Sequence, residues 1–163
     1  MHSSIVRRTA LAALLLAACE SSTGSEPMEG VYVAQSVNGR AVPAVLDSLA
    51  WSDGTTYTLH RLLGASVEFL DGENARYTFQ ERLVAYSGAD SIAAADCRSV
   101  TLPYRREGGR VVLVVEPRIF GQDGRLRLDT LLVQNGQLVQ NVRTAAGQSV
   151  PVTFAPAQQP EHC

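Results

Sequence analysis

Candidate catalytic side chains are few and lie far apart in the sequence. A nucleophilic enzyme needs a serine, threonine or cysteine beside a positioned general base, and histidine is the usual base. His60 and His162 stand alone, and Ser87 and Ser91 are distant from His60 along the chain. There is no Gly-x-Ser-x-Gly, His-Glu-x-x-His or phosphate-cradling glycine motif. We therefore predict no catalytic residue, no cofactor and no enzymatic activity, with His60 at the surface or hydrogen-bonded within the wall of the fold.

Two groups of carboxylates could in principle form a calcium site or an acid–base pair. Glu68, Asp71 and Glu73 surround one predicted turn, and Asp90 and Asp96 flank a predicted loop. Neither group has the alternate-position spacing of a dedicated calcium loop. Solvated turns are the favoured interpretation, calcium binding is the alternative, and no metal site is predicted.

Aromatic residues near the ends of the predicted strands are the candidates for ligand binding. Small-molecule pockets are usually lined by aromatic and apolar side chains with few polar anchors. The same residues could instead fill the ends of the fold and belong to its core. The candidate ligand-binding residues are Trp51, Tyr57, Tyr86, Tyr104 and Phe120.

Turn signals recur at short intervals along the chain from Gly30 onward. Pairs such as Asn-Gly and Asp-Gly supply the positive φ angles that tight hairpins need, so their repetition predicts a meander of antiparallel strands. The pairs are Asn38-Gly39, Asp53-Gly54, Asp71-Gly72, Ser87-Gly88, Gly108-Gly109, Asp123-Gly124, Asn135-Gly136 and Gly147-Gln148.

Between these turns, apolar and polar residues alternate with the period of two that half-buried strands require. Only residues 111–115 are apolar at every position, which predicts a strand covered on both faces. Three segments separate into two faces: Ala75, Tyr77 and Phe79 from Arg76, Thr78, Gln80 and Arg82; Leu126 and Leu128 from Arg125, Arg127 and Asp129; Val150, Val152 and Phe154 from Pro151 and Thr153.

The predicted architecture is a small all-β barrel made of about eight or nine antiparallel strands in up-and-down order. Closure is favoured over an open sheet because a long free edge promotes aggregation. Residues 43–51 have apolar side chains at helical spacing after a proline, which predicts a short helix after the first strand. Residues 89–96 are predicted to form a loop or one helical turn. Strands are expected near 30–37, 55–62, 66–70, 74–86, 99–106, 110–116, 125–134, 137–143 and 149–155.

The N-terminal segment has the layout of a secretory signal. Arg7 and Arg8 precede about ten apolar residues, which are too few to span the roughly 30 Å hydrocarbon core of a bilayer as a helix. The ending Leu16-Ala17-Ala18-Cys19 resembles a bacterial lipobox, which implies cleavage before Cys19 and its lipidation. The expected organisation is a signal peptide at 1–18, a polar tether at 19–28 and one barrel domain at 29–163.

The resemblance to bacterial lipoproteins also predicts a location. It implies a domain anchored to the membrane of the cell envelope through its N-terminal lipid and facing the periplasm. Glu20, rather than aspartate, follows the lipidated cysteine, which favours the outer membrane over the inner. The net charge of −2 includes no basic stripe, so nucleic acid is not an expected partner.

If Cys19 carries lipid, two of the three cysteines are left over, Cys97 and Cys163. An oxidising compartment favours a disulfide between such a pair, and two free thiols are the alternative. Without paired histidines, two distant cysteines do not supply a zinc site.

The opening of the first predicted strand, Gly30-Val31-Tyr32, followed by residues 36–43, resembles bacterial lipocalin-like lipoproteins. That resemblance implies an up-and-down barrel able to hold an apolar or amphipathic small molecule without chemistry. The alternative is a protein-interaction or hydrolase-inhibitor module of the envelope, with a filled barrel and exposed anchors. Tyr104-Arg105-Arg106 is the sequence candidate for such an anchor.

Overall fold

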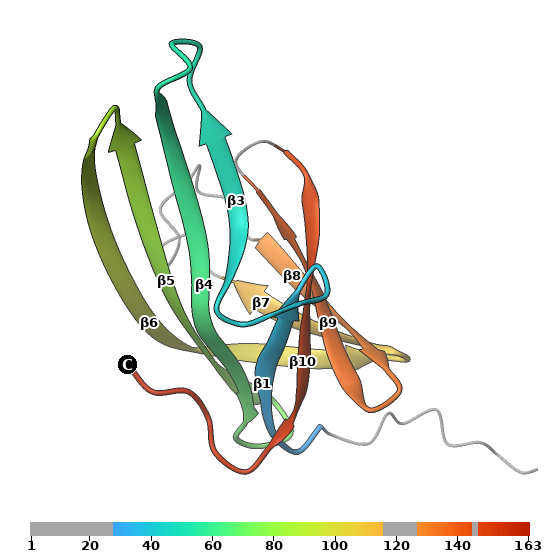
Figure 1. Cartoon of the computed structure of the whole chain (residues 1–163). Helices are drawn as coiled ribbons and strands as arrows, with labels where there is room; N and C mark the ends of the chain where they lie inside the picture. Colours follow the sequence, from blue (N-terminus) through green and yellow to red (C-terminus); the bar gives the residue numbers. More distant parts are fainter. Residues whose placement is uncertain (1–27, 116–126, 145–146) are drawn as a thin grey trace, which may run out of the picture.

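The computed structural model describes residues 28–115, 127–144 and 147–163, which form one antiparallel all-β structure (Figure 1). No helix within these ranges has the length and hydropathy needed to cross a bilayer. The strands are β1 (Gly30–Val37), β2 (Arg40–Ala41), β3 (Ala44–Ala50), β4 (Thr56–Phe69), β5 (Asn74–Ser87), β6 (Asp90–Glu107), β7 (Arg110–Val115), β8 (Arg127–Gln134), β9 (Gln137–Arg143) and β10 (Ser149–Ala157).

Eight of these strands close into a barrel, as the sequence predicts. Consecutive strands from β4 to β10 are neighbours, β10 pairs with β1, and β1 returns to β4. Tight turns permit this order: Asn135 and Gly136 have φ values of 51° and 76°, which suit the two-residue hairpin between β8 and β9. The barrel is therefore an up-and-down meander with two extra strands, β2 and β3, attached to it.

The predicted helix at 43–51 is wrong, because this segment contains β3. Short apolar runs do not distinguish helix from strand by periodicity alone. Residues 56–62 of β4 extend beyond the part of β4 that pairs with β1, and β3 supplies their missing partner. Long-range pairing therefore overrides the local helical spacing.

The predicted loop at 89–96 and the predicted break near residue 64 are also wrong. Residues 90–96 form the first part of β6 and pair continuously with β5, even though alanine has a weak preference for strands. The segments expected at 55–62 and 66–70 are one strand, β4, whose pairing with β5 shifts register between Leu62 and Gly64. A bulge of this kind bends a strand without ending it.

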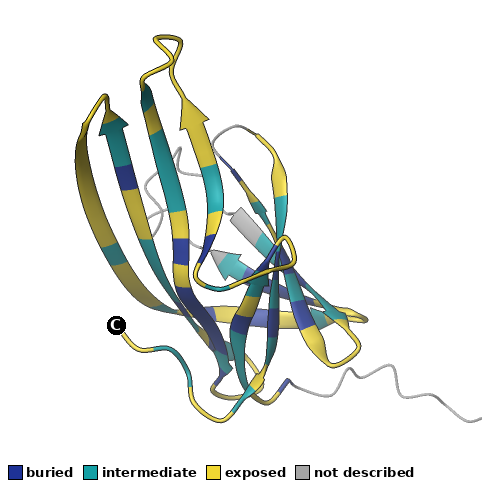
Figure 2. Cartoon of the chain, in the orientation of Figure 1, coloured by how far each residue is buried: buried dark blue, intermediate teal, exposed yellow. Residues whose placement is uncertain are grey.

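The core occupies the closed half of the barrel (Figure 2). Val111, Val112 and Leu113 are all buried, so the strand that was predicted to be covered on both faces is covered on both in this segment. Val152 and Phe154 of β10 are buried as well, and Tyr77 and Phe79 of β5 pack against the same core. The alternation in these strands therefore predicts the correct inward faces.

A four-stranded sheet projects beyond the closed barrel at the upper left of Figure 1. We call it the projecting sheet; it consists of β3 and residues 56–62, 81–87 and 90–96 of β4, β5 and β6. Most of its residues are exposed or half-buried, in contrast to the closed half (Figure 2). Among the described residues, large apolar side chains that remain exposed on this sheet or its connections are Val45, Leu49, Trp51, Tyr57, Leu83 and Ile92.

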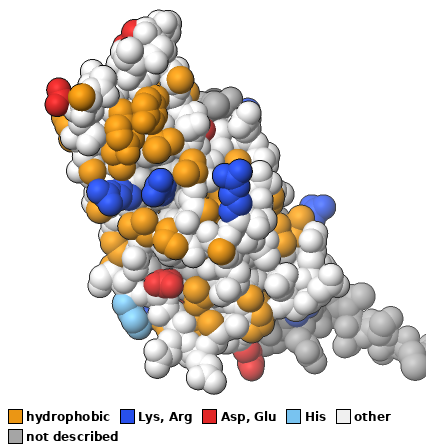
Figure 3. Space-filling model, viewed as in Figure 1, with side chains coloured by type: hydrophobic (Ala, Val, Ile, Leu, Met, Phe, Trp, Pro, Cys, Tyr) orange, Lys and Arg blue, Asp and Glu red, His pale blue; other side chains and the backbone are white. Residues whose placement is uncertain are grey.

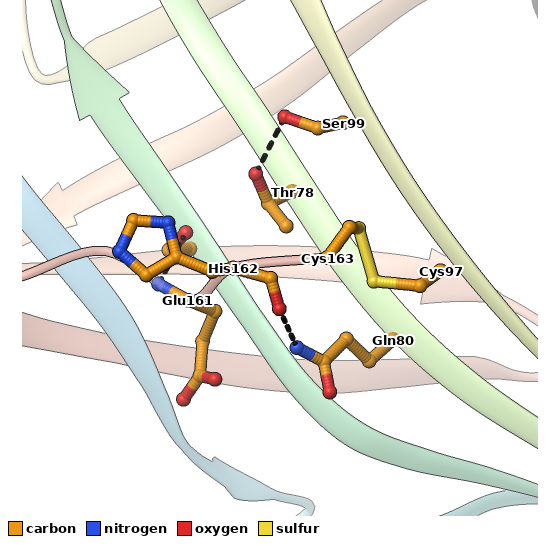
Figure 4. Close-up of a disulfide and its surroundings, with 8 residues drawn as sticks. Thr78, Gln80, Cys97, Ser99, Glu161, His162 and Cys163 are labelled. Atoms are coloured by element: carbon orange, nitrogen blue, oxygen red, sulfur yellow. Dashed lines mark hydrogen bonds between the residues drawn. A yellow bond between two sulfur atoms is a disulfide. The ribbon is translucent and has the colours of Figure 1, made fainter.

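The C-terminal tail crosses the outside of β4, β5 and β6 and is fastened there (Figure 4). Cys163 forms a disulfide with Cys97 of β6, with the two Cα atoms 5.4 Å apart, as the cysteine count predicts. The Gln80 side-chain amide donates to the backbone carbonyl of His162, and the Glu161 backbone N–H donates to the Ser66 hydroxyl. The tail therefore braces the outer wall and leaves the barrel interior free.

Candidate ligand cavity

The interior of the barrel is partly hollow at the end from which the projecting sheet extends. The cavity has a volume of about 420 Å³ and is open to solvent. Its volume lies in the range of small-molecule sites, roughly 300–1,000 Å³. The lining residues come from β3, β4, β5, β8, β9 and β10: Leu46, His60, Leu62, Ala65, Tyr77, Phe79, Glu81, Asp129, Gln140, Asn141, Val142, Arg143, Val152 and Phe154.

Strand alternation places these side chains inside. Tyr77, Phe79 and Glu81 are successive inward positions of β5, and Gln140 and Val142 are successive inward positions of β9. The closed half of each strand carries apolar inward residues, whereas the inward positions nearer the mouth include polar ones. The cavity is consequently amphipathic, with apolar walls and a small set of polar groups.

A chain of hydrogen bonds crosses the barrel interior from β5 to β9 and continues to β8. The Tyr77 hydroxyl donates to Oε1 of Gln140 at 2.9 Å, and Nε2 of Gln140 donates to Oδ2 of Asp129 at 2.5 Å. Burial raises the pKa of Asp129 above its ordinary value, although the hydrogen bonds from Gln140 and from the Thr130 backbone oppose the rise. Burial likewise raises the pKa of Tyr77, so its hydroxyl stays protonated as the donor.

The alternation groups Asp129 with Arg125 and Arg127 on the polar face of its strand, but the structure turns Asp129 inward. Its carboxyl lines the cavity, and Leu131, two residues further along β8, is fully buried. Polarity alone predicts an outward position for an acidic residue. Here the hydrogen bond from the Gln140 side chain compensates for part of the cost of placing the carboxylate inside.

A second polar pair lies nearer to solvent. Nε2 of His60 and Oε2 of Glu81 are 2.5 Å apart, on neighbouring strands β4 and β5. The hydrogen bond to Glu81 raises the pKa of His60, and this effect outweighs the opposing effect of partial burial. His60 is thus a cavity-wall residue with a satisfied ring nitrogen, which agrees with its predicted place in the wall of the fold.

Four of the aromatic residues singled out from the sequence, Trp51, Tyr57, Tyr86 and Tyr104, are not among the residues that line this cavity. Tyr57 and Tyr86 stack on each other with ring centroids 4.5 Å apart, on the outer face of the projecting sheet. Trp51 follows β3 and is 56% exposed. Phe120 lies outside the described residues. Tyr104 is only 6% exposed, and its hydroxyl donates to the backbone carbonyls of Met28 and Asp71.

Of the carboxylates considered for calcium, Asp71 bonds to its own turn, whereas Asp90 and Asp96 lie in β6 and Asp96 pairs with Arg98. Asp71 accepts hydrogen bonds from the backbone N–H groups of Glu73 and Asn74, and these bonds lower the pKa of Asp71. Glu68 pairs with Arg76. In the part of the chain that the structure describes, no cluster of three or more metal-ligating side chains occurs.

Sequence reasoning missed Tyr77, Glu81, Asp129 and Gln140 as a possible binding set. A signal was present, since Glu81 and Gln140 occupy inward positions where the alternation calls for apolar residues. Their meeting across the barrel depends on closure and register, which no local pattern specifies. Comparison with protein-family models, curated protein sequences and solved structures found no match.

Proposed function

We propose that this chain is a lipid-anchored protein of the bacterial envelope whose barrel binds an amphipathic small molecule without transforming it. The observation that carries the proposal is the open cavity of about 420 Å³ inside the barrel. A barrel of eight strands can also be filled by its own side chains, so a hollow interior distinguishes a binding protein from a purely structural one. This supports the binding hypothesis over a filled interaction module.

The distribution of polarity in the cavity indicates the orientation of the ligand. Leu62, Phe79 and Val142 offer an apolar surface to the body of the ligand. Asp129 and Gln140 provide a buried polar end, where a ligand hydroxyl or amine can donate a hydrogen bond to the carboxylate. Among the described residues, no cation forms an ion pair with Asp129, which leaves it suited to such a donor.

A thermal-shift titration tests this function. Alkyl alcohols, alkyl amines and fatty acids of matched chain length are added to the protein, and we expect compounds with a donor head group to raise Tm. Ala65, a small buried residue of the cavity wall, is changed to Leu and to Phe to reduce the volume, while Ala50→Phe on the exposed part of β3 is the matched control.

The cavity variants should lose the ligand-induced rise in Tm in order of added volume, and the control should retain it. Ala65→Leu is included because the larger substitution, Ala65→Phe, can disturb folding. If no compound in the panel raises Tm of the unmodified protein, or if the cavity variants respond as strongly as the control, binding inside the barrel is ruled out.

The anchor rests on separate support, the lipobox-like ending at Cys19. Mass spectrometry of the protein from its native cells should find residues 1–18 removed and Cys19 carrying acyl chains. An unmodified Cys19 would remove the anchor from the proposal and leave the cavity function untouched.

A protein-interaction role is the second candidate, and the exposed apolar side chains of the projecting sheet favour it. Figure 3 shows hydrophobic side chains over the upper part of one face, above a row of basic side chains. Tyr104 does not serve as the anchor for such a role, because it is buried. Arg105, beside it, pairs with Glu107. Interaction through the projecting sheet is thus better supported than interaction through the 104–106 segment.

A further inference from the structure

One edge of the projecting sheet is open. Residues 90–103 of β6 pair with β5 on one side, and β7 begins to pair with β6 only at Tyr104. In the described part of the chain, no strand lies on the other side of residues 90–103. Residues 90–95 are all exposed, and Ile92 is 77% exposed (Figure 2). Such an edge presents backbone N–H and C=O groups that can pair with another strand.

The opposite edge of the projecting sheet, β3, differs in two respects. Its pairing with β4 shifts register between Val45 and Asp47, and Asp47 places a charge within the strand. Irregularities and charges of this kind discourage edge pairing. Residues 91–95, Ser-Ile-Ala-Ala-Ala, have neither a charge nor a proline, and their pairing with β5 has no register shift. The β6 edge is therefore the one suited to adding a strand.

We propose that this edge pairs with the same edge of a second copy of the chain, antiparallel and centred on Ala94. A two-fold pairing of identical edges closes on itself and gives a dimer rather than a fibre. The proposal does not depend on what the cavity binds. It joins two projecting sheets into one continuous sheet and supplies partners for the open row of backbone groups.

The charges at the two ends of the segment favour this register. With Ala94 at the centre, Ile92 faces Asp96, and Asp90 of one copy faces Arg98 of the other, which also pairs with Asp96 of its own chain. The Asp90–Arg98 contact is a favourable cross-strand pair. Ala93 then faces Ala95, so small side chains meet on the other face. A register centred one residue earlier places Asp90 opposite Asp96, two like charges, and is disfavoured.

Cysteine cross-linking tests the register. Residue 94 faces its own copy in this dimer, and directly opposed residues in an antiparallel pair have Cα atoms about 4.5–5.5 Å apart, which a disulfide can span. In a full-length chain carrying Cys19→Ser, Ala94→Cys should form a covalent dimer on mild oxidation. Val45→Cys, on the β3 edge, is the matched control and should not. Peptide mapping checks that the Cys97–Cys163 disulfide is intact.

A charge exchange tests the pairing without new cysteines. Asp90→Arg and Arg98→Asp should each weaken the dimer at least several-fold in sedimentation equilibrium, and the double variant should recover most of the loss. Ala94→Lys should give a monomer, since residue 94 faces its own copy and the two lysines would lie directly opposite each other. A chain that stays monomeric at millimolar concentration, or Val45→Cys cross-linking as well as Ala94→Cys, would overturn the proposal. A chain whose β6 edge pairs only with a strand of another protein would also stay monomeric at millimolar concentration.

Discussion

The closed half of the barrel and the projecting sheet are built from the same strands, β4, β5 and β6, yet they differ in burial. In the closed half, inward residues such as Val67 and Leu102 are almost fully buried, because β7 to β10 and β1 provide the opposite wall. In the projecting sheet, Leu83 and Ile92 are exposed, because the described residues provide no opposite wall. The cavity lies where these two regions meet. We therefore expect the closed half of the barrel to supply most of the stability. Recognition is expected in the cavity and on the projecting sheet.

Truncating one large side chain in each region should give the largest contrast. Phe154→Ala removes a fully buried ring of β10 and should cost about 3–5 kcal/mol of unfolding free energy. Ile92→Ala, in the exposed part of β6, should change it by less than about 0.5 kcal/mol. Urea unfolding of both variants measures the difference. Equal losses would show that the projecting sheet is covered and that the two regions do not differ.

The disulfide should contribute the next largest effect. Its two cysteines are 66 residues apart in sequence, and cross-links over loops of this length stabilise by roughly 2–4 kcal/mol. Cys97→Ser with Cys163→Ser should lower Tm, and a reducing agent should have the same effect on the unmodified protein. Because the tail lies outside the barrel, the double variant should still bind the cavity ligand once folded. Loss of binding in a folded double variant would contradict the separation of outer brace and inner site.

Asp129 gives a smaller effect that depends on pH. Burial raises the pKa of its carboxyl, so the unfolded chain loses this proton at a lower pH than the folded one. Ionisation therefore costs folding free energy as pH rises from the unfolded-state pKa through the folded-state pKa. Asp129→Asn should gain stability relative to the unmodified protein over that rise. Urea unfolding at pH 3 and pH 7 measures the free energies of unfolding of the variant and the unmodified protein. If the difference between these free energies is the same at both pH values, the Asp129 carboxyl is not buried.

The His60–Glu81 pair should give the smallest effect. The hydrogen bond to Glu81 raises the pKa of His60, so the pair stabilises the folded state below the unfolded-state pKa of about 6.5. That contribution is lost as pH rises through the higher folded-state pKa. Because both side chains are partly exposed, the gain should stay below about 1 kcal/mol. Glu81→Gln should remove this pH dependence of stability. NMR titration of the His60 ring in the Glu81→Gln variant should give a lower pKa than in the unmodified protein, and an unchanged pKa would contradict the account.

Much of the barrel can be predicted from the sequence because its information is local. Turn pairs such as Asn135-Gly136 and alternation such as that in residues 74–86 specify strands and inward faces directly. The predictions of secondary structure fail where long-range strand pairing determines the conformation of a segment. Residues 44–50 and 90–96 become strands because β4 and β5 extend past the closed barrel and need neighbours. Nothing within those segments records that requirement.

The cavity was harder to predict than the fold. Aromatic side chains were expected to line it, but Tyr104 fills the core and Tyr57 lies on the outer face of the sheet. The residues that do line it, such as Asp129 and Gln140, read as surface residues because of their polarity. A closed interior can hold them only because each finds a hydrogen-bond partner on another strand, and that pairing depends on the register across the whole barrel.

The most direct test of the account is where a bound amphiphile sits. A spin-labelled alkyl amine is added to protein whose methyl groups are isotope-labelled. The loss of NMR signal that the spin label causes is measured for each methyl group. The methyl signals of Val142 and Val152, in the cavity wall, should disappear first, while those of Leu49 and Ile92 persist. If the signals of Leu49 and Ile92 vanish and those of the cavity wall are unchanged, the ligand binds the projecting sheet and the barrel interior is not the binding site.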